Sequence, residues 1–377
     1  MAKGKMKLLF LANVPSPYRV EFFNALSREC ELTVLYQLHS SAERDKLWTA
    51  QADTGYRQVF LQGKATDVDK ALCPGVTKWL GMDFDAVVIC GNSSPTELLA
   101  IFWCKLRHIP YCLEGDGAFA GSGKGAKEWL KGLAVGGAGL YLSTCKELDN
   151  YYLLYGARKE KLRRYRFSSL TQADILPRCP TPEEKRHLRS KLGMQEEKIL
   201  LSIGQFIPRK GFDLLLQAAN GMDGSIGIYI VGGVPGEGYL RYAQENDLTN
   251  VHFVGFQTKQ ALKDYYMAAD AFVLPTREDI WGLVVNEAMA FGLGVVTTHR
   301  CNAGLELIRD GGNGYLVPTG DVHSLRQAML LSLEHSERLG AAALETIRPY
   351  TVQGMAEDHM KHLTAYVQGL PNRKETT

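Results

Sequence analysis

Short apolar runs with the composition of buried strands alternate with helical patterns along the whole sequence, and this alternation constrains the fold most. Runs such as Lys7–Val14 and Lys198–Gly204 each precede a segment whose apolar residues recur at helical spacing. Strands that alternate with helices form parallel sheets joined by right-handed crossovers. Because 377 residues exceed what one hydrophobic core usually holds, we predict an α/β fold with two domains.

A cluster of prolines near the middle of the chain suggests where the two domains meet. The segment Arg166–Thr181 has mixed polarity, and prolines gather between 177 and 182. We expect an N-terminal domain over 1–168, a linker over 169–182 and a C-terminal domain over 183–350, with a last helix over about 354–370.

The composition excludes several classes of protein. A net charge of +2 argues against a dedicated nucleic-acid binder, and no apolar run is long enough to span a bilayer. The eight cysteines include no CxxC pair, which favours free buried thiols in a reducing compartment and argues against a metal site. We therefore expect a cytoplasmic protein without a metal or cofactor.

Two carboxylates frame the start of a predicted helix in the C-terminal half. Asp279 and Glu287 follow the apolar strand Ala271–Pro275 and flank a helix start at Gly282 and Leu283. A helix N-terminus exposes unpaired N–H groups and attracts anions, and glycine lets the backbone approach a ligand closely. A carboxylate beside a phosphate is better suited to accept hydrogen bonds from sugar hydroxyls. A nucleotide-sugar satisfies all of these groups.

A basic loop follows the first strand of the same half. Arg209 and Lys210 stand before Gly211 in this loop. A lysine here can neutralise a diphosphate leaving group, whereas a solvated basic turn is the structural alternative.

These segments together resemble the retaining GT-B glycosyltransferases of the family-4 type. Thr276–Gly294 is similar to their E-x7-E motif, with Asp279 in place of the first glutamate. Ser202–Gly211 looks like their G-R-x4-K-G phosphate loop, with Gln205 in place of the arginine. Further matches in the expected order cover the C-terminal half, at 251–256, 268–275 and 310–317. The N-terminal half is matched mainly at one loop, 15–19.

The resemblance implies a GT-B fold, in which two Rossmann-like domains face a cleft and the C-terminal helix crosses back to the N-terminal domain. It implies a metal-independent, retaining enzyme of hexosyltransferase type. Such an enzyme moves a sugar from a nucleoside diphosphate donor, with UDP favoured over GDP, to a hydroxyl of a glycan or lipid-linked acceptor. The expected setting is the synthesis of polysaccharide or cell-surface glycans.

The resemblance also assigns roles to single residues. Asp279 would hold the hydroxyls of the transferred sugar near the anomeric carbon, and Lys210 and Arg209 would stabilise the leaving diphosphate. Donor binding is expected from the ribose contact Glu287, the backbone amides of Gly282 and Leu283, Gln205 in the phosphate loop, and Pro17, Tyr18 and Arg19 in the loop after the first strand.

Two further carboxylates end a strand in the N-terminal half. Glu114 and Asp116 lie near the point where many family-4 enzymes carry a histidine. One of them would orient the acceptor hydroxyl or stabilise an oxocarbenium-like centre; capping the loop that follows is an equal alternative.

The segment 124–166 contains ten Lys or Arg and four Asp or Glu, with Trp129, Leu130 and Leu133 among them. Basic and apolar residues in combination suit an anionic membrane surface, which would place the protein at the inner face of the membrane. A solvated basic face is the commoner alternative, and the glycines of this segment weaken a helix.

Two other functions stay open at this stage. A nucleotide-sugar epimerase can share the GT-B architecture and would convert the donor without an acceptor. A non-catalytic GT-B subunit is kept open by the aspartate and glutamine that depart from the two motifs. A dinucleotide oxidoreductase is disfavoured because no G-x-G-x-x-G follows the first strand.

Overall fold

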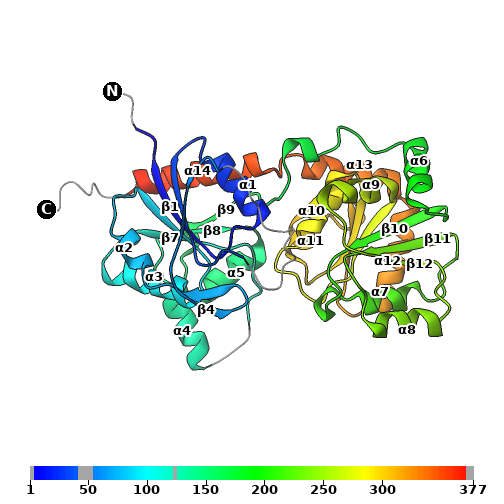
Figure 1. Ribbon diagram of the computed structural model, residues 1–377, viewed down its shortest axis with the longest axis horizontal. Helices are drawn as coiled ribbons and strands as arrows, with labels where there is room; N and C mark the ends of the chain where they lie inside the picture. Colours follow the sequence, from blue (N-terminus) through cyan, green and yellow to red (C-terminus); the bar gives the residue numbers. More distant parts are fainter. Residues whose placement is uncertain (1–3, 41–53, 122–124, 371–377) are drawn as a thin grey trace. The chain divides into compact units, whose positions relative to one another are not determined.

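The computed structural model describes residues 4–40, 54–121 and 125–370 (Figure 1). The chain divides into two compact units, each with its own parallel sheet. Unit 1 comprises Met1–Ser169 together with Thr351–Thr377, and unit 2 comprises Leu170–Tyr350. The prediction of an α/β fold with two domains of parallel sheet is confirmed. The segment 170–182, expected to be part of a linker, belongs to unit 2.

Unit 1 contains a seven-stranded parallel sheet in the order β3-β2-β1-β6-β7-β8-β9. The order reverses between β1 and β6, which is where ligands gather in doubly wound sheets. The strands are β1 Lys7–Ala12, β2 Glu31–Tyr36, β3 Arg57–Phe60, β6 Ala86–Cys90, β7 Tyr111–Glu114, β8 Leu140–Ser143 and β9 Leu162–Arg164, and β4 Lys64–Asp67 forms a separate antiparallel hairpin with β5 Lys70–Leu72.

The helices of unit 1 connect these strands. Helix α3 begins with signals that can be read in the sequence: Ser94 before Pro95 predicts a helix start. The Ser94 hydroxyl accepts a hydrogen bond from the Glu97 amide at 3.1 Å, and Pro95 is the first helical residue. The helices are α1 Pro17–Leu26, α2 Val76–Leu80, α3 Pro95–Leu106, α4 Ala126–Val135, α5 Lys146–Leu154, the short 3-10 helix η2 Lys159–Lys161 and α14 Val352–Gln368.

Apolar residues at helical spacing predict a helix over Arg19–Cys30, and the observed helix α1 differs from this prediction at both ends. It begins at Pro17, whose fixed φ suits a first helical position, and it ends at Leu26. The earlier end has a physical reason, since the Glu31 amide donates to the Met6 carbonyl at 2.8 Å. The helix must therefore end several residues before Glu31, so that β2 can pair with β1 in this register.

The last helix, α14, packs against α1 in unit 1, as Figure 1 shows with α14 in red and α1 in blue. The Arg166 guanidinium binds this helix through two hydrogen bonds to Asp358, each of 2.8 Å, and the Arg166 amide donates to the same carboxylate at 2.9 Å. His359 is fully buried and lies against the rings of Phe22 and Tyr165, with centroids 4.6 and 4.4 Å away. The predicted return of the C-terminal helix to the N-terminal domain is confirmed.

Unit 2 contains a six-stranded parallel sheet in the order β12-β11-β10-β13-β14-β15. Its strands are β10 Lys198–Ile203, β11 Ile226–Val231, β12 Val251–Val254, β13 Ala271–Leu274, β14 Gly294–Thr298 and β15 Gly314–Val317. Its helices are η3 Gln172–Asp174, α6 Pro182–Leu192, η4 Pro208–Lys210, α7 Phe212–Ala219, α8 Glu237–Glu245, α9 Lys259–Ala268, α10 Leu283–Ala290, α11 Asn302–Leu307, α12 Val322–Glu334 and α13 Ser336–Ile347.

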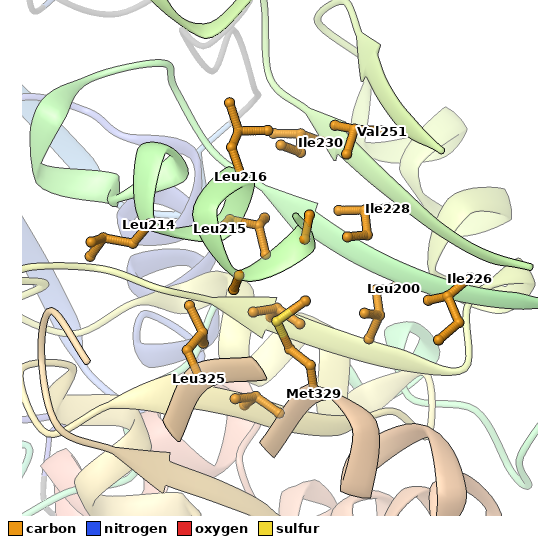
Figure 2. Packing of buried hydrophobic residues seen from close by; sticks show 14 of the residues in the cluster. Leu200, Leu214, Leu215, Leu216, Ile226, Ile228, Ile230, Val251, Leu325 and Met329 are labelled. Carbon is orange, nitrogen blue, oxygen red and sulfur yellow. The ribbon is translucent and has the colours of Figure 1, made fainter. Parts of the chain in front are cut away.

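The core of unit 2 fills the space between its sheet and two of its helices. Figure 2 shows Leu200 and Ile228 of the sheet, Leu215 of α7 and Met329 of α12 in this cluster, and all four side chains are fully buried. Burying each such side chain contributes about 1.5–3 kcal/mol. This packing holds the strand ends of unit 2 in fixed positions.

Candidate active site

Two loops meet at the carboxyl edge of the sheet of unit 2. One loop leaves β10 and leads to η4, and the other leaves β13 and leads to α10. Strands β10 and β13 are neighbours, and the strand order reverses between them. The parallel sheet therefore brings the predicted phosphate loop and the predicted acidic loop together at its switch point.

The two loops share one carboxylate. The Lys210 ammonium donates to Asp279 at 2.6 Å, and Arg209 Nη1 lies 3.5 Å from the other oxygen of the same carboxylate. Side-chain exposure is 13% for Lys210 and 10% for Asp279, so the pair lies mostly out of water. Two cations around one carboxylate leave an excess of positive charge, which favours an anionic ligand.

Backbone contacts hold the two loops in this register. The Arg209 carbonyl accepts hydrogen bonds from the Arg277 amide at 2.8 Å and from the Thr276 hydroxyl at 2.9 Å. Arg277 also forms two hydrogen bonds with Asp213 of α7, at 2.7 and 2.6 Å. A nearby ion pair joins Glu278 to Arg300. Sequence reasoning did not find Asp213 because it lies 64 residues from its partner.

The helix start beside these side chains requires a glycine. Gly282 has φ +100°, and a Cβ at this position would lie 2.8 Å from Cys301 Sγ. Leu283 is the first residue of α10, and the Val285 amide of the same turn donates to the Gly282 carbonyl at 2.9 Å. The two amides that the sequence analysis assigns to a diphosphate, those of Gly282 and Leu283, thus lie at a helix start beside Asp279.

Glu287 lies one turn into α10 and accepts a hydrogen bond from the Tyr266 hydroxyl at 2.9 Å. Tyr266 belongs to α9 and is 2% exposed. Its burial, and secondly the charge of Glu287, raise the pKa of the Tyr266 hydroxyl well above its usual range, so it is a hydrogen-bond donor. Sequence reasoning missed Tyr266, since nothing in its local pattern separates it from a core tyrosine. Gln205 is exposed directly after β10.

The predicted residues of the N-terminal half meet inside unit 1. Arg19 is 5% exposed and forms ion pairs with Glu114, at 2.5 Å, and with Asp116. The Tyr18 hydroxyl donates to Asp116 at 2.8 Å. Pro17, Tyr18 and Arg19 form the first turn of α1. The sequence left two interpretations of these residues open, a loop that contacts the donor and a plain helix N-terminus, and the structure has the helix start.

The Glu114 side chain is fully buried at the end of β7. Its carboxylate also accepts a hydrogen bond from the Tyr165 hydroxyl at 3.3 Å, and His359 Nε2 lies 3.6 Å away. Burial, the largest single influence, would raise the pKa of Glu114, but the charge of Arg19 and the contacts with His359 together outweigh it and hold the pKa well below its usual range. Glu114 thus neutralises a buried arginine, a role that neither sequence interpretation included. Asp116 keeps 23% of its side chain exposed.

The basic segment 124–166 contains α4, which presents apolar side chains to solvent. Trp129 is 67% exposed, Leu130 44% and Leu133 40%. Lys124 and the Lys127 side chain lie outside the described residues. Within residues 4–40, 54–121 and 125–370, no helix has the length and apolarity needed to cross a membrane.

The family model described as Glycosyl transferases group 1 matches residues 184–345. A D-inositol 3-phosphate glycosyltransferase of Mycobacteroides abscessus is 34% identical over 148 residues, which are 37% of this chain and 33% of that protein. A second such protein, from Catenulispora acidiphila, is 30% identical over 215 residues, 53% of this chain and 49% of its own length. The chain thus spans one third to one half of the length of these curated relatives.

Solved structures match over nearly the whole chain. The Anabaena protein HepE in complex with UDP has a TM-score of 0.74 at 17% identity, over 96% of this chain and 100% of that chain. Sucrose-phosphate synthase from Thermosynechococcus elongatus has a TM-score of 0.72 at 17% identity, over 97% and 99% of the two chains. These likenesses show the fold alone, and they confirm the GT-B fold predicted from the sequence. Over residues 184–345, the chain is similar to the glycosyl transferases group 1 family.

Proposed function

We propose that this protein is a retaining glycosyltransferase that moves a sugar from a nucleoside diphosphate to a hydroxyl of a glycan or lipid-linked acceptor. The observation that supports it best is the 2.6 Å contact between Lys210 and Asp279 beside the helix start at Gly282. An ammonium has three donors, so Lys210 can bind Asp279 and a diphosphate at once. Asp279 in turn accepts hydrogen bonds from the sugar that leaves that diphosphate.

The chemistry of the leaving group follows from the same residues. When the bond between the anomeric carbon and the diphosphate breaks, negative charge grows on the diphosphate oxygens. Lys210, Arg209 and Gly282 at the start of α10 are already held around the Asp279 carboxylate, so they would stabilise this charge without rearrangement. Glu287 would accept hydrogen bonds from the ribose hydroxyls of the donor. We propose that this donor is a UDP-sugar.

Calorimetric titration with UDP, GDP, ADP and dTDP, without metal, tests the donor site. We expect saturable binding of UDP and weaker binding of the other three. Failure of all four to bind would favour a non-catalytic subunit. Conversion of a UDP-sugar to its epimer in the absence of any acceptor would instead favour an epimerase.

The Tyr266→Phe variant tests whether Glu287 binds the nucleotide. Phenylalanine keeps the packing but removes the hydroxyl that orients the Glu287 carboxylate at 2.9 Å. Losing one such hydrogen bond costs about 1 kcal/mol, so we expect UDP affinity to fall about fivefold. Tyr265→Phe on the same helix is the matched control. Equal UDP affinity in the wild type and both variants would remove Glu287 from the proposed site.

We further propose that unit 1 contacts an anionic membrane through α4, as suits a lipid-linked acceptor in the synthesis of cell-surface glycans. Trp129, Leu130 and Leu133 are exposed on this helix, and Lys131 and the basic residues up to 166 lie nearby in sequence. Apolar side chains among basic ones bind the boundary between headgroups and acyl chains. The protein would then act in the cytoplasm at the inner face of the membrane.

The Trp129→Ser variant tests this contact. We expect its partition onto phosphatidylglycerol vesicles to fall about tenfold, since the indole supplies the largest apolar area. Leu330→Ser is the control, because Leu330 is 43% exposed on α12 of unit 2. Wild-type protein that stays in solution with these vesicles in a sedimentation assay would contradict the membrane contact.

A further inference from the structure

Unit 1 contains a cavity of about 650 Å³ that the proposed function does not use. It lies at the amino ends of β7 and β8, where Tyr111 and Gly139 stand, and it is closed on another side by Tyr366 of α14. Glu114 and its ion pair with Arg19 lie at the opposite, carboxyl end of β7. The cavity is therefore separate from the residues already described.

The charges that line the cavity are all basic. Lys105, His108 and Lys161 contribute to the wall, and none of its lining residues is Asp or Glu. In the described part of the chain, neither Lys105 nor Lys161 forms a salt bridge. Glu160, the sequence neighbour of Lys161, pairs with Arg158 at 3.4 Å.

The two ammonium groups are held by backbone carbonyls. Lys105 donates to the Gly136 carbonyl at 2.6 Å and to the Leu133 carbonyl, and Lys161 donates to the Ala138 carbonyl at 2.9 Å. Burial lowers the pKa of both lysines. Since each ammonium has three donors, both retain a donor for a ligand. A cation without a counter-charge in a partly dry site favours an anion.

A buried hydroxyl in the same wall lacks an acceptor. Tyr111 is 3% exposed, and its hydroxyl has no hydrogen-bond partner among the described residues. Leaving such a group unsatisfied costs about 1–3 kcal/mol, and native structures seldom keep one without a reason. The hydroxyl oxygen has almost no accessible surface, so an oxygen of a bound ligand would supply the missing acceptor once the side chains around it move aside.

The backbone around the cavity takes left-handed conformations at two lining positions. Gly137 has φ +90° and His108 has φ +54°. His108 ends α3 in a Schellman motif, in which the Ile109 amide donates to the Cys104 carbonyl at 2.8 Å. Glycine usually occupies this position, and a side chain there costs about 1 kcal/mol. With histidine at this position, an imidazole lines the cavity together with the two lysines.

We propose that this cavity binds a phosphate group carried by a small organic ligand or by a phospholipid. Lys105 and Lys161 would balance its charge, and the His108 imidazole and the Tyr111 hydroxyl would donate to its oxygens. The volume lies within the usual range for small-molecule sites and exceeds the size of inorganic phosphate alone. Both sources present the same phosphate, so the experiment has one arm for each.

The first arm titrates the full chain with glycerol 3-phosphate by calorimetry. Lys161→Gln is expected to weaken binding at least about tenfold, as the loss of a charge-assisted contact does. Tyr111→Phe should weaken it about fivefold without lowering the melting temperature, because it removes a hydroxyl that has no partner. Lys159→Gln makes the same change of charge on an exposed residue outside the cavity and should leave the affinity unchanged.

The second arm measures binding to vesicles of phosphatidylglycerol and of phosphatidylcholine alone. Saturable binding of glycerol 3-phosphate, weakened by Lys161→Gln and Tyr111→Phe, supports a site for a free phosphate ligand. Preference for phosphatidylglycerol vesicles with the same sensitivity, and no binding of glycerol 3-phosphate, supports a headgroup site. The proposal would be overturned if neither variant weakened the binding of either probe. It would also be overturned if Lys159→Gln weakened binding as much as Lys161→Gln.

Discussion

Replacing Lys210 with alanine is expected to lower the rate of sugar transfer by about 10²- to 10³-fold, the usual cost of removing one preorganised group at a developing charge. The ammonium lies 2.6 Å from Asp279 and is 13% exposed. Little water can therefore replace it when the diphosphate leaves. The measurement is the initial rate of transfer from the donor that calorimetry identifies, together with the affinity for UDP, which we expect to fall as well.

A control separates this effect from the loss of an ion pair as such. Lys191→Ala also removes an ion pair, with Asp264 at 2.7 Å, but the Lys191 side chain is 60% exposed on α6. We expect its transfer rate to match the wild type, since exposed pairs contribute little. If Lys210→Ala transferred sugar at the wild-type rate, the phosphate loop would have no part in the reaction.

The Arg19→Met variant is expected to lower the free energy of unfolding by about 3–5 kcal/mol, because it leaves Glu114 charged and buried without its partner. The Glu114 side chain is fully buried, and Arg19 Nη1 lies 2.5 Å from its carboxylate. Denaturant unfolding followed by circular dichroism measures the change.

A double variant tests the cause of this loss. Arg19→Met with Glu114→Gln removes both charges of the pair, so it should recover part of the stability that Arg19→Met loses. Equal stability of the single and double variants would show that the lost packing of the arginine, and not the unpaired carboxylate, causes the effect.

The same pair determines how stability depends on pH. The pKa of Glu114 is lowered in the folded protein, so its contribution is complete above the unfolded pKa of about 4.3 and is lost as the pH falls through the folded value. In Arg19→Met the charge of Arg19 is lost while Tyr165 and His359 remain. We expect burial then to outweigh these contacts and to raise the pKa of Glu114, so unfolding becomes easier as the pH rises above about 4.3. We therefore expect the difference in melting temperature between wild type and Arg19→Met to shrink from pH 7 to pH 4. A constant difference would contradict this assignment.

Elements with strong local signals could be predicted from the sequence. Proline and a serine cap mark the start of α3, and the apolar run of β13 is followed by proline and then by the glycine that begins α10. Weaker elements were missed: β3 is a four-residue strand at the edge of its sheet, and its sequence RQVF carries no alternating pattern. Its strand conformation depends on pairing with β2, which no local pattern expresses.

The sequence by itself determined the residues of the candidate active site in unit 2, because Lys210 and Asp279 lie in the segments that follow β10 and β13 of a parallel sheet. Ends of neighbouring parallel strands meet at one edge, so short-range patterns were enough to bring them together. Only the tertiary structure decided the role of Arg19 and Glu114, which are 95 residues apart. Whether such a pair meets in water or in a dry interior depends on how helices cover the sheet, and here α1 and α14 enclose it, so that both charges are buried and must neutralise each other.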